Sequence, residues 1–315
     1  MPIGPPTPPG QPPAPPGAPP TISAPPPPPP PPSGPPPPAP GPTVGGGSRY
    51  LIVSYYDWGQ DAGASIAGGG FQANAPASNM LIPRPQLTAI ASGGSVSFTL
   101  NLGETRTIGL IHIQNLIVDV SATISVTAGT YTSGNVPAWA NDANGVYPAV
   151  EWNALGRPRF FVPPAPVTTN SINVSVSGSI IPVQIGFLGA CEIWQAPVNM
   201  SYGWSISTID LSDVTRVTFG STYVVKRPLS RRLNLGVDFL LQDGIYVGRG
   251  DQVFSRPLAL AVINGKSSPI AVVPFPDDTY NLERTSVAGF ASTDQQFAND
   301  QFATWKGTFQ VDQLV

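Results

Sequence analysis

Apolar and polar residues alternate strictly along residues 95–102, whose sequence is SVSFTLNL. Successive side chains of a β-strand point to opposite faces of a sheet, so this alternation places Val96, Phe98, Leu100 and Leu102 on one buried face. Residues 305–311 alternate in a similar way near the C-terminus. Both segments are therefore predicted to be strands, and the second one ties the end of the chain into a sheet.

Between these two segments, short runs rich in β-branched and aromatic residues are separated by turn residues, which is typical of strands. In the first half the runs are residues 50–56, 108–113, 122–126, 171–176, 180–187 and 190–194, with a loop-rich stretch at 127–170. In the second half they are 204–207, 215–219, 222–225, 233–235, 258–263, 270–273 and 284–290. Residues 237–242 favour a short helix or turn, and no predicted helix exceeds two turns. The predicted fold class is all-β.

The first 48 residues differ from the rest, because they contain no charged side chain and more than half of them are proline. Such a composition cannot form a hydrophobic core, and the eight prolines of residues 25–32 favour polyproline II. We therefore expect an extended proline-rich arm over 1–48, a jelly-roll-like β-sandwich over 49–199 and a second β domain over 200–315. The arm is either a strap along a neighbouring subunit or a solvated linker.

Charge is scarce in this chain and slightly negative overall. Lys and Arg number 15 and Asp and Glu 18, so only 10% of residues are charged, against roughly a quarter in ordinary soluble domains. This balance attracts neither nucleic acid nor an anionic membrane, and it suits a homo-oligomer whose surfaces lie against other subunits. No apolar run reaches the ~20 residues of a membrane span, and the N-terminus lacks the pattern of a signal peptide. Synthesis in a cytoplasm without a secretion signal is expected.

Candidate catalytic residues are few. His112 is the only histidine and lies on an alternating segment, and Cys191 is the only cysteine and lies among apolar residues, so structural roles are predicted for both. No catalytic residue, metal site or cofactor is predicted. A glycan-degrading site built on two carboxylates stays open as a lesser alternative, with Glu151 and Glu192 as candidates because each lies near a tryptophan.

Aromatic residues in predicted loops are the candidate binding residues. A sugar ring could stack on them, or another subunit could bury them. The remaining alternative is that they simply cover their own sandwich. They are Trp58, Trp139, Tyr147 and Trp152.

Three short sequences occur in a fixed order: NMLIPRP at residues 79–85, LGETRTIGLI at 102–111 and IGFLGA at 185–190. In this order they resemble a group of tail-associated structural proteins of tailed bacteriophages and prophages. The resemblance covers most of residues 50–235 loosely. At 113–116 the chain differs from that group, since IQNL stands where a His-Asn pair is usual.

This resemblance implies a jelly-roll of the carbohydrate-binding or discoidin type in a tail tip, baseplate or tail fibre. The expected function is that of a non-catalytic structural protein of the virion, made in the host cytoplasm, with other virion proteins as partners. The alternative function is recognition of a host-surface glycan. Neither nucleic acid binding nor membrane insertion is expected.

Overall fold

The fold is all-β, as predicted. The computed structural model describes residues 49–142, 145–196, 200, 202–216, 222–225, 229–241, 267–292, 296–301 and 304–314. The predicted arm over 1–48 and the predicted strand over 258–263 lie outside these residues. Within the described ranges the α-helices are the short α1 (Ala149–Ala154) and α4 (Leu282–Thr285). Among these residues no helix is long and apolar enough to cross a membrane.

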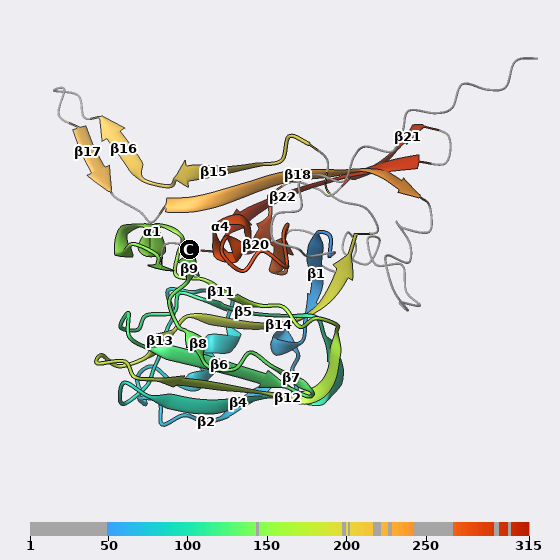
Figure 1. Cartoon of the computed structure of the whole chain (residues 1–315). Helices are drawn as coiled ribbons and strands as arrows, with labels where there is room; N and C mark the ends of the chain where they lie inside the picture. The colour runs from blue at the N-terminus through green and yellow to red at the C-terminus, as the bar shows by residue number, and fades with distance from the viewer. Residues whose placement is uncertain are drawn as a thin grey trace, which may run out of the picture. The chain divides into compact units, whose positions relative to one another are not determined.

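Two antiparallel sheets carry the structure (Figure 1). The smaller sheet has six strands, in the order β2, β4, β12, β6 and β7, with β8 also pairing with β6. Its long central strand β4 (Val96–Ile108) confirms the predicted alternation, because the four predicted core side chains are at most 5% exposed. The other strands are β2 (Ser65–Gly68), β12 (Val167–Ser177), β6 (Thr123–Ala128), β7 (Tyr131–Thr132) and β8 (Val136–Pro137).

The larger sheet has ten strands, in the order β11, β5, β14, β1, β19, β20, β22, β18 and β15, with β21 also pairing with β22. Three of them face the smaller sheet: β11 (Arg159–Phe161), β5 (Leu110–Gln114) and β14 (Phe187–Gln195). The others are β1 (Ile52–Asp57), β19 (Ile270–Val273), β20 (Val287–Ala291), β22 (Thr304–Gln313), β18 (Leu229–Leu241), β15 (Ser205–Asp210) and β21 (Gln296–Gln301).

Strand β1 connects the two halves of the chain. It pairs with β14 on one side and with β19 on the other, so one sheet runs across the predicted boundary between 199 and 200. The main core lies between the two sheets, and Leu100, Ile111 and Leu188 belong to it. Two further clusters cover the opposite faces of the extended sheet. All four residues of β19 are buried, which explains its continuous apolar sequence. The division into 49–199 and 200–315 stays a prediction.

Some predicted elements were wrong. Residues 237–241, predicted as helix or turn, continue strand β18, because Leu233, Leu235 and Val237 alternate into the core and the pairing with β22 resumes after a bulge. Of the strand predicted over 180–187, only β13 (Gln184–Ile185) and the first residue of β14 are strand. Pro182 interrupts that run and has no N–H to donate.

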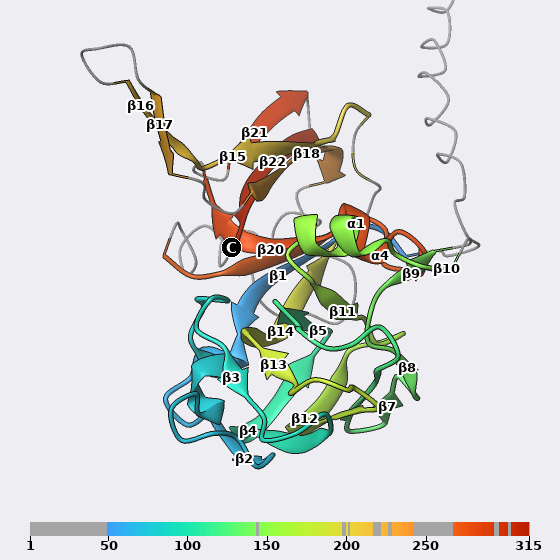
Figure 2. The same ribbon diagram turned by 90° about the vertical axis from the view of Figure 1, so that its left-hand side faces the viewer.

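Small two-stranded sheets complete the structure. Strand β13 pairs with β3 (Ala89–Ile90), and β9 (Asn141–Asp142) pairs with β10 (Gly145–Val146). The hairpin of β16 (Asp213–Arg216) and β17 (Thr222–Val225) is exposed at every residue. Figures 1 and 2 both show it as a ribbon set apart from the two sheets.

Candidate functional site

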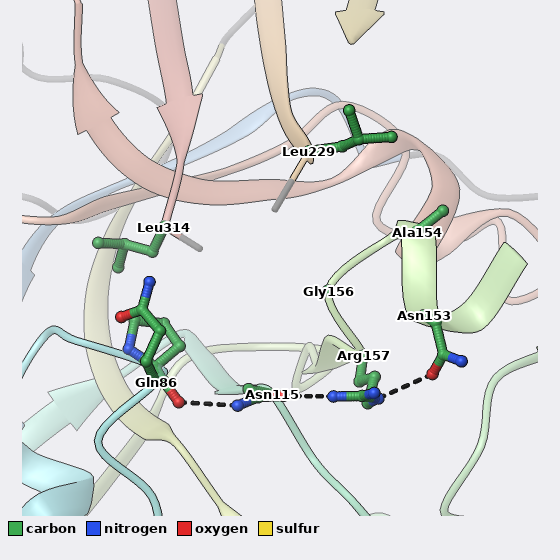
Figure 3. Close-up of a pocket in the computed structure, with 9 residues that line it drawn as sticks. Gln86, Asn115, Asn153, Ala154, Gly156, Arg157, Leu229 and Leu314 are labelled. Carbon is green, nitrogen blue, oxygen red and sulfur yellow. Dashed lines mark hydrogen bonds between the residues drawn. The ribbon is translucent and has the colours of Figure 1, made fainter. Parts of the chain in front are cut away.

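One pocket, here called the Arg157 pocket, has a volume of about 450 Å³, within the usual range of ligand sites. Figure 3 places Gln86, Asn115, Arg157 and Asn153 in a row, with Leu229 and Leu314 facing them. The pocket is thus polar on one side and apolar on the other. Its remaining lining residues are Pro85, Ala154 and Gly156.

The end of α1 presents Arg157 to this pocket. The helix stops because Gly156 adopts a left-handed conformation, with φ of 78°, which glycine tolerates. Arg157 follows with φ of 53°, a conformation that is uncommon for a residue with a side chain. Its backbone N–H donates to the carbonyl of Trp152, and its Nε donates to Oδ1 of Asn153 at 2.8 Å. The chain reversal therefore folds the guanidinium back over the helix that carries it.

Asn115 holds the guanidinium from the other side. It follows β5 and has φ of 55°, which Asn tolerates better than most residues. Its Oδ1 accepts from Nη1 of Arg157 at 2.8 Å, and its Nδ2 donates to the carbonyl of Pro85 at 2.8 Å. Because one end of the amide accepts and the other donates, its orientation is fixed by its partners. The only non-glycine residues with positive φ in the described part of the chain are thus neighbours at one pocket.

Close contacts at two glycines fix the walls of the pocket. A Cβ atom on Gly186 would lie 2.2 Å from the carbonyl oxygen of Pro85, so a larger residue there would displace Pro85. A Cβ atom on Gly156 would lie 2.8 Å from Nε2 of Gln313, whose amide donates to the carbonyl of Leu155 at 2.6 Å. The C-terminal strand is thereby attached to the end of α1.

Arg157 gives the pocket a positive charge. Its side chain is half-buried, and burial lowers the pKa of its guanidinium from the ordinary value, although an arginine stays charged at neutral pH. Both side-chain acceptors that it contacts are neutral amides. Among the described residues it forms no ion pair, and the lining contains no carboxylate. The positive charge therefore lacks a compensating group in the described part of the chain.

A second, smaller pocket of about 270 Å³ surrounds Arg106 and is called here the Arg106 pocket. Arg106 contacts Asp61 at 3.2 Å and Glu104 at 3.3 Å, and its guanidinium carbon lies 4.1 Å from the ring centre of Trp58. Asp61 also accepts from the hydroxyl of Tyr56 at 2.6 Å, a bond that raises the pKa of Tyr56. This arginine is neutralised and stacked within the chain.

Three of the four predicted aromatic residues form one internal cluster. Trp152 on α1 is fully buried and stacks on Trp139, with ring centres 6.0 Å apart, while Nε1 of Trp139 donates to the carbonyl of Val118. Tyr147 is 2% exposed, and its hydroxyl donates to the carbonyl of Tyr280 at 2.6 Å. Tyr147 and Trp152 therefore pack on their own protein, which is the alternative that the sequence left open.

Trp58 and Trp139 are half-buried. Arg106 covers one face of the Trp58 ring, and Tyr56 lies against it at 4.3 Å between ring centres. Contact of either tryptophan with a glycan or a subunit stays a prediction. None of the four aromatics lines the Arg157 pocket, but Trp152 anchors the helix that presents Arg157.

His112, Cys191 and Glu151 occupy structural positions. His112 is buried in β5 against Phe160 and Phe187, and burial lowers its pKa to about 3. Cys191 is buried in β14, as predicted, and burial raises the pKa of its thiol. Glu151 forms a two-pronged ion pair with Arg284, at 2.6 and 3.1 Å. The described residues contain no cluster of acidic, His or Cys side chains that could hold a metal ion.

Sequence reasoning did not single out Gln86, Asn153 or Arg157. Asn115 drew notice only as part of the segment that differs from the resembled group. The one local signal is the sequence Gly156-Arg157-Pro158, in which a glycine and a proline mark the end of a helix.

No protein-family model matches the chain, and no curated protein matches it. Among solved structures, it is similar to the family 32 CBM from C. perfringens NanJ in complex with galactose, at 12% identity and a TM-score of 0.34, covering 44% of this chain and 99% of that one. It is also similar to a fucose binding module from Streptococcus pneumoniae, SpX-3, at 7% identity and a TM-score of 0.32, covering 44% of this chain and 98% of that one. A mutant lectin binding domain of Lectinolysin complexed with Lewis b has 8% identity, a TM-score of 0.33 and the same coverage of both chains. Similarity at this level carries no argument about function.

Proposed function

We propose that this chain is a non-catalytic binding protein that recognises a carbohydrate in the Arg157 pocket. The observation that carries the proposal is the convergence of Gln86, Asn115, Asn153 and Arg157 on one pocket of about 450 Å³. Amide and guanidinium groups are planar and place donors and acceptors side by side. Neighbouring hydroxyls of a sugar ring match such groups, and the apolar wall of Leu229 and Leu314 suits the C–H face of the ring.

Two features support binding without hydrolysis. Hydrolysis of a glycosidic bond ordinarily needs a pair of carboxyl groups in the site, and the described lining has none. The polar groups are also held in place by the left-handed backbone at Asn115 and Arg157 and by their mutual hydrogen bond. A preorganised site loses little conformational entropy when a ligand binds.

Gln86 is the side chain best placed to test this proposal. It is exposed and forms no hydrogen bond within the described residues, so its amide is available to a ligand and its loss should leave the fold intact. The full-length chain is made multivalent and applied to a glycan array, because avidity makes weak single-site binding measurable. The glycans that bind are then titrated by calorimetry.

We expect a defined subset of glycans to bind, and Gln86→Ala to weaken binding several-fold. Arg216→Gln is the control. Arg216 lies on the exposed β16–β17 hairpin, so this substitution removes no group from the pocket. Retention of no glycan at all, or equal affinity of the Gln86→Ala variant, would refute carbohydrate binding in this pocket.

A second candidate function is assembly into the virion of a tailed bacteriophage as a homo-oligomer. The hairpin β16–β17 favours it, because Val214, Tyr223, Val224 and Val225 are 40–65% exposed. A two-stranded hairpin is at best marginally stable alone in water, so other virion proteins or further copies that cover it would stabilise it. In this proposal the arm over 1–48 fastens the protein to its neighbours in the tail.

Removal of residues 1–44 tests the assembly proposal. The truncated protein should stay folded by circular dichroism and fail to enter phage particles. Normal occupancy of the truncated protein in purified particles would contradict a role for the arm.

A further inference from the structure

Arginines in the described chain are mostly neutralised by carboxylates. Five of them form ion pairs: Arg49 with Asp277, Arg106 with Asp61, Arg159 with Glu283, Arg232 with Asp312 and Arg284 with Glu151. The buried Arg231 donates to three backbone carbonyls and to Oε1 of Gln313, and Glu283 attracts it as well.

Arg157 departs from this pattern. Its side-chain hydrogen bonds use Nε and Nη1, so they occupy two of the five N–H donors of a guanidinium and leave three for a ligand. It is half-buried rather than fully hydrated, and the acceptors that hold it are uncharged. Amides do not neutralise the charge of a partly desolvated cation, so a bound anion would stabilise it.

We infer that the sugar bound in the Arg157 pocket carries a carboxylate. This inference rests on the proposed carbohydrate function and adds the chemical class of the ligand. The carboxylate accepts from the unused N–H groups of Arg157, and the sugar hydroxyls contact the amides of Gln86 and Asn153 beside it. Arginine and carboxylate are both planar, so two parallel hydrogen bonds can form.

The charge of the whole chain favours an isolated acidic sugar over a long polyanion. The formal net charge is −3, and the pocket contains one cation. Nucleic acid would need several phosphate contacts, each with its own basic residue. A single acidic residue within a glycan needs only the one that is present.

The test compares each acidic sugar with its own methyl ester, which keeps the ring and the hydroxyls and removes the charge. Oligosaccharides that contain glucuronate, galacturonate or sialic acid are titrated into the full-length chain by calorimetry, each beside its ester, with a sulfated oligosaccharide and acetate as further arms. At about 20 mM salt at least one acid should bind about tenfold more tightly than its ester, and at about 150 mM the difference should shrink.

Variants assign the preference to one side chain. Arg157→Gln should bind the acid and its ester equally, whereas Arg216→Gln should keep the preference of the wild type. Arg157→Lys keeps the charge but loses the planar fork, so it should keep part of the preference. This second variant decides the matter if Arg157→Gln fails to fold by circular dichroism.

Each of the remaining results would refute a different part of the inference or of the proposed function. Equal binding of acid and ester by the wild type refutes the carboxylate and leaves carbohydrate binding standing, whereas binding of neither refutes the proposed function itself. Tighter binding of the sulfated sugar refutes the choice of a carboxylate. Acetate that binds as tightly as the acidic sugars would make the pocket a simple anion site.

Discussion

The Arg106 and Arg157 pockets place the same side chain in opposite electrostatic settings. Arg106 lies between Asp61 and Glu104 and stacks on Trp58, so its charge and one face of its guanidinium are already used. Arg157 is held by amide oxygens alone, at a pocket whose described lining has no acid. A neutralised arginine stabilises the segments that it joins, whereas an arginine fixed by neutral groups keeps its charge for a ligand.

The supports of the two arginines differ as well. Trp58 is half-buried and lies directly beneath Arg106, whereas Trp152 is fully buried and acts on Arg157 through the helix α1. Substitution of each tryptophan should therefore affect one pocket and not the other.

The largest expected effect comes from Trp152→Ala. Loss of a fully buried tryptophan costs about 3–5 kcal/mol of unfolding free energy, and α1 should lose its anchor. Trp58→Ala should cost less, about 1–2 kcal/mol, because its ring is partly exposed and the main loss is the contact with Arg106. Urea unfolding measures both changes.

The affinity of these two variants for the acidic sugar is the second measurement. The folded fraction of Trp152→Ala should bind more weakly than the wild type, and Trp58→Ala should bind normally. Normal binding by Trp152→Ala would break the proposed link between the aromatic cluster and Arg157.

The next effect depends on pH, because the buried carboxyl of Asp57 directly precedes Trp58, whose ring Arg106 covers. Asp57 accepts from the N–H of Gly59, beside Trp58, and burial raises its pKa to about 7. Between about pH 4 and pH 6.5, Asp57 is thus protonated in the folded chain and ionised in the unfolded chain. Over the same range His112 is neutral in the folded chain and protonated in the unfolded chain. The two contributions oppose each other, so together they leave the unfolding free energy nearly flat over this range.

Single variants should uncover each slope. In Asp57→Asn the His112 contribution remains, so the unfolding free energy should rise with pH from about 4 to 6.5, by up to about 1.4 kcal/mol per pH unit. In His112→Phe the Asp57 contribution remains, so the unfolding free energy should fall as pH rises from about 4 to 7. Denaturant unfolding at several pH values measures both, and slopes of the same sign in the two variants would contradict this account. Acidic sugar binding should stay unchanged over this range, because Arg157 stays charged.

A smaller effect should follow from making the Arg157 pocket resemble the Arg106 pocket. Gln86→Glu supplies the missing carboxylate within the lining, so it should neutralise Arg157 and weaken binding of the acidic sugar about tenfold. Binding of the methyl ester should change less, which calorimetry measures in the same series. The Gln86→Ala variant separates loss of the amide from gain of the charge, and equal losses in the two variants would argue against an electrostatic cause.

The contrast between the pockets also marks what the sequence can predict. Local patterns were sufficient for residues 96–102 of β4, which alternate with period two, and for β19, whose four buried residues form one apolar run. They could not place Asn115 beside Arg157, because 42 residues separate the two along the chain and their approach depends on two left-handed backbone positions.

The burial of Trp152 and Tyr147 could not be predicted for a related reason. Trp152 lies on a helix of six residues, too short for its periodicity to stand out, and a contact with Trp139 buries it. Tyr147 is held by Tyr280, far along the chain. Whether a loop aromatic is exposed depends on such distant partners, which composition and spacing do not contain.

The smallest expected effect concerns the backbone that holds Arg157. Its φ of 53° disfavours every residue with a Cβ and is easy for glycine, so Arg157→Gly should change the unfolding free energy by less than about 1 kcal/mol, as relief of strain offsets two lost side-chain hydrogen bonds. Arg157→Val loses the same bonds and adds a β-branched side chain in the left-handed region, so it should be less stable than Arg157→Gly by about 1–2 kcal/mol. Thermal unfolding ranks the two, while both should lose the preference for an acidic sugar. If the valine variant equals the glycine variant in stability, the left-handed backbone is not what holds this arginine in its pocket.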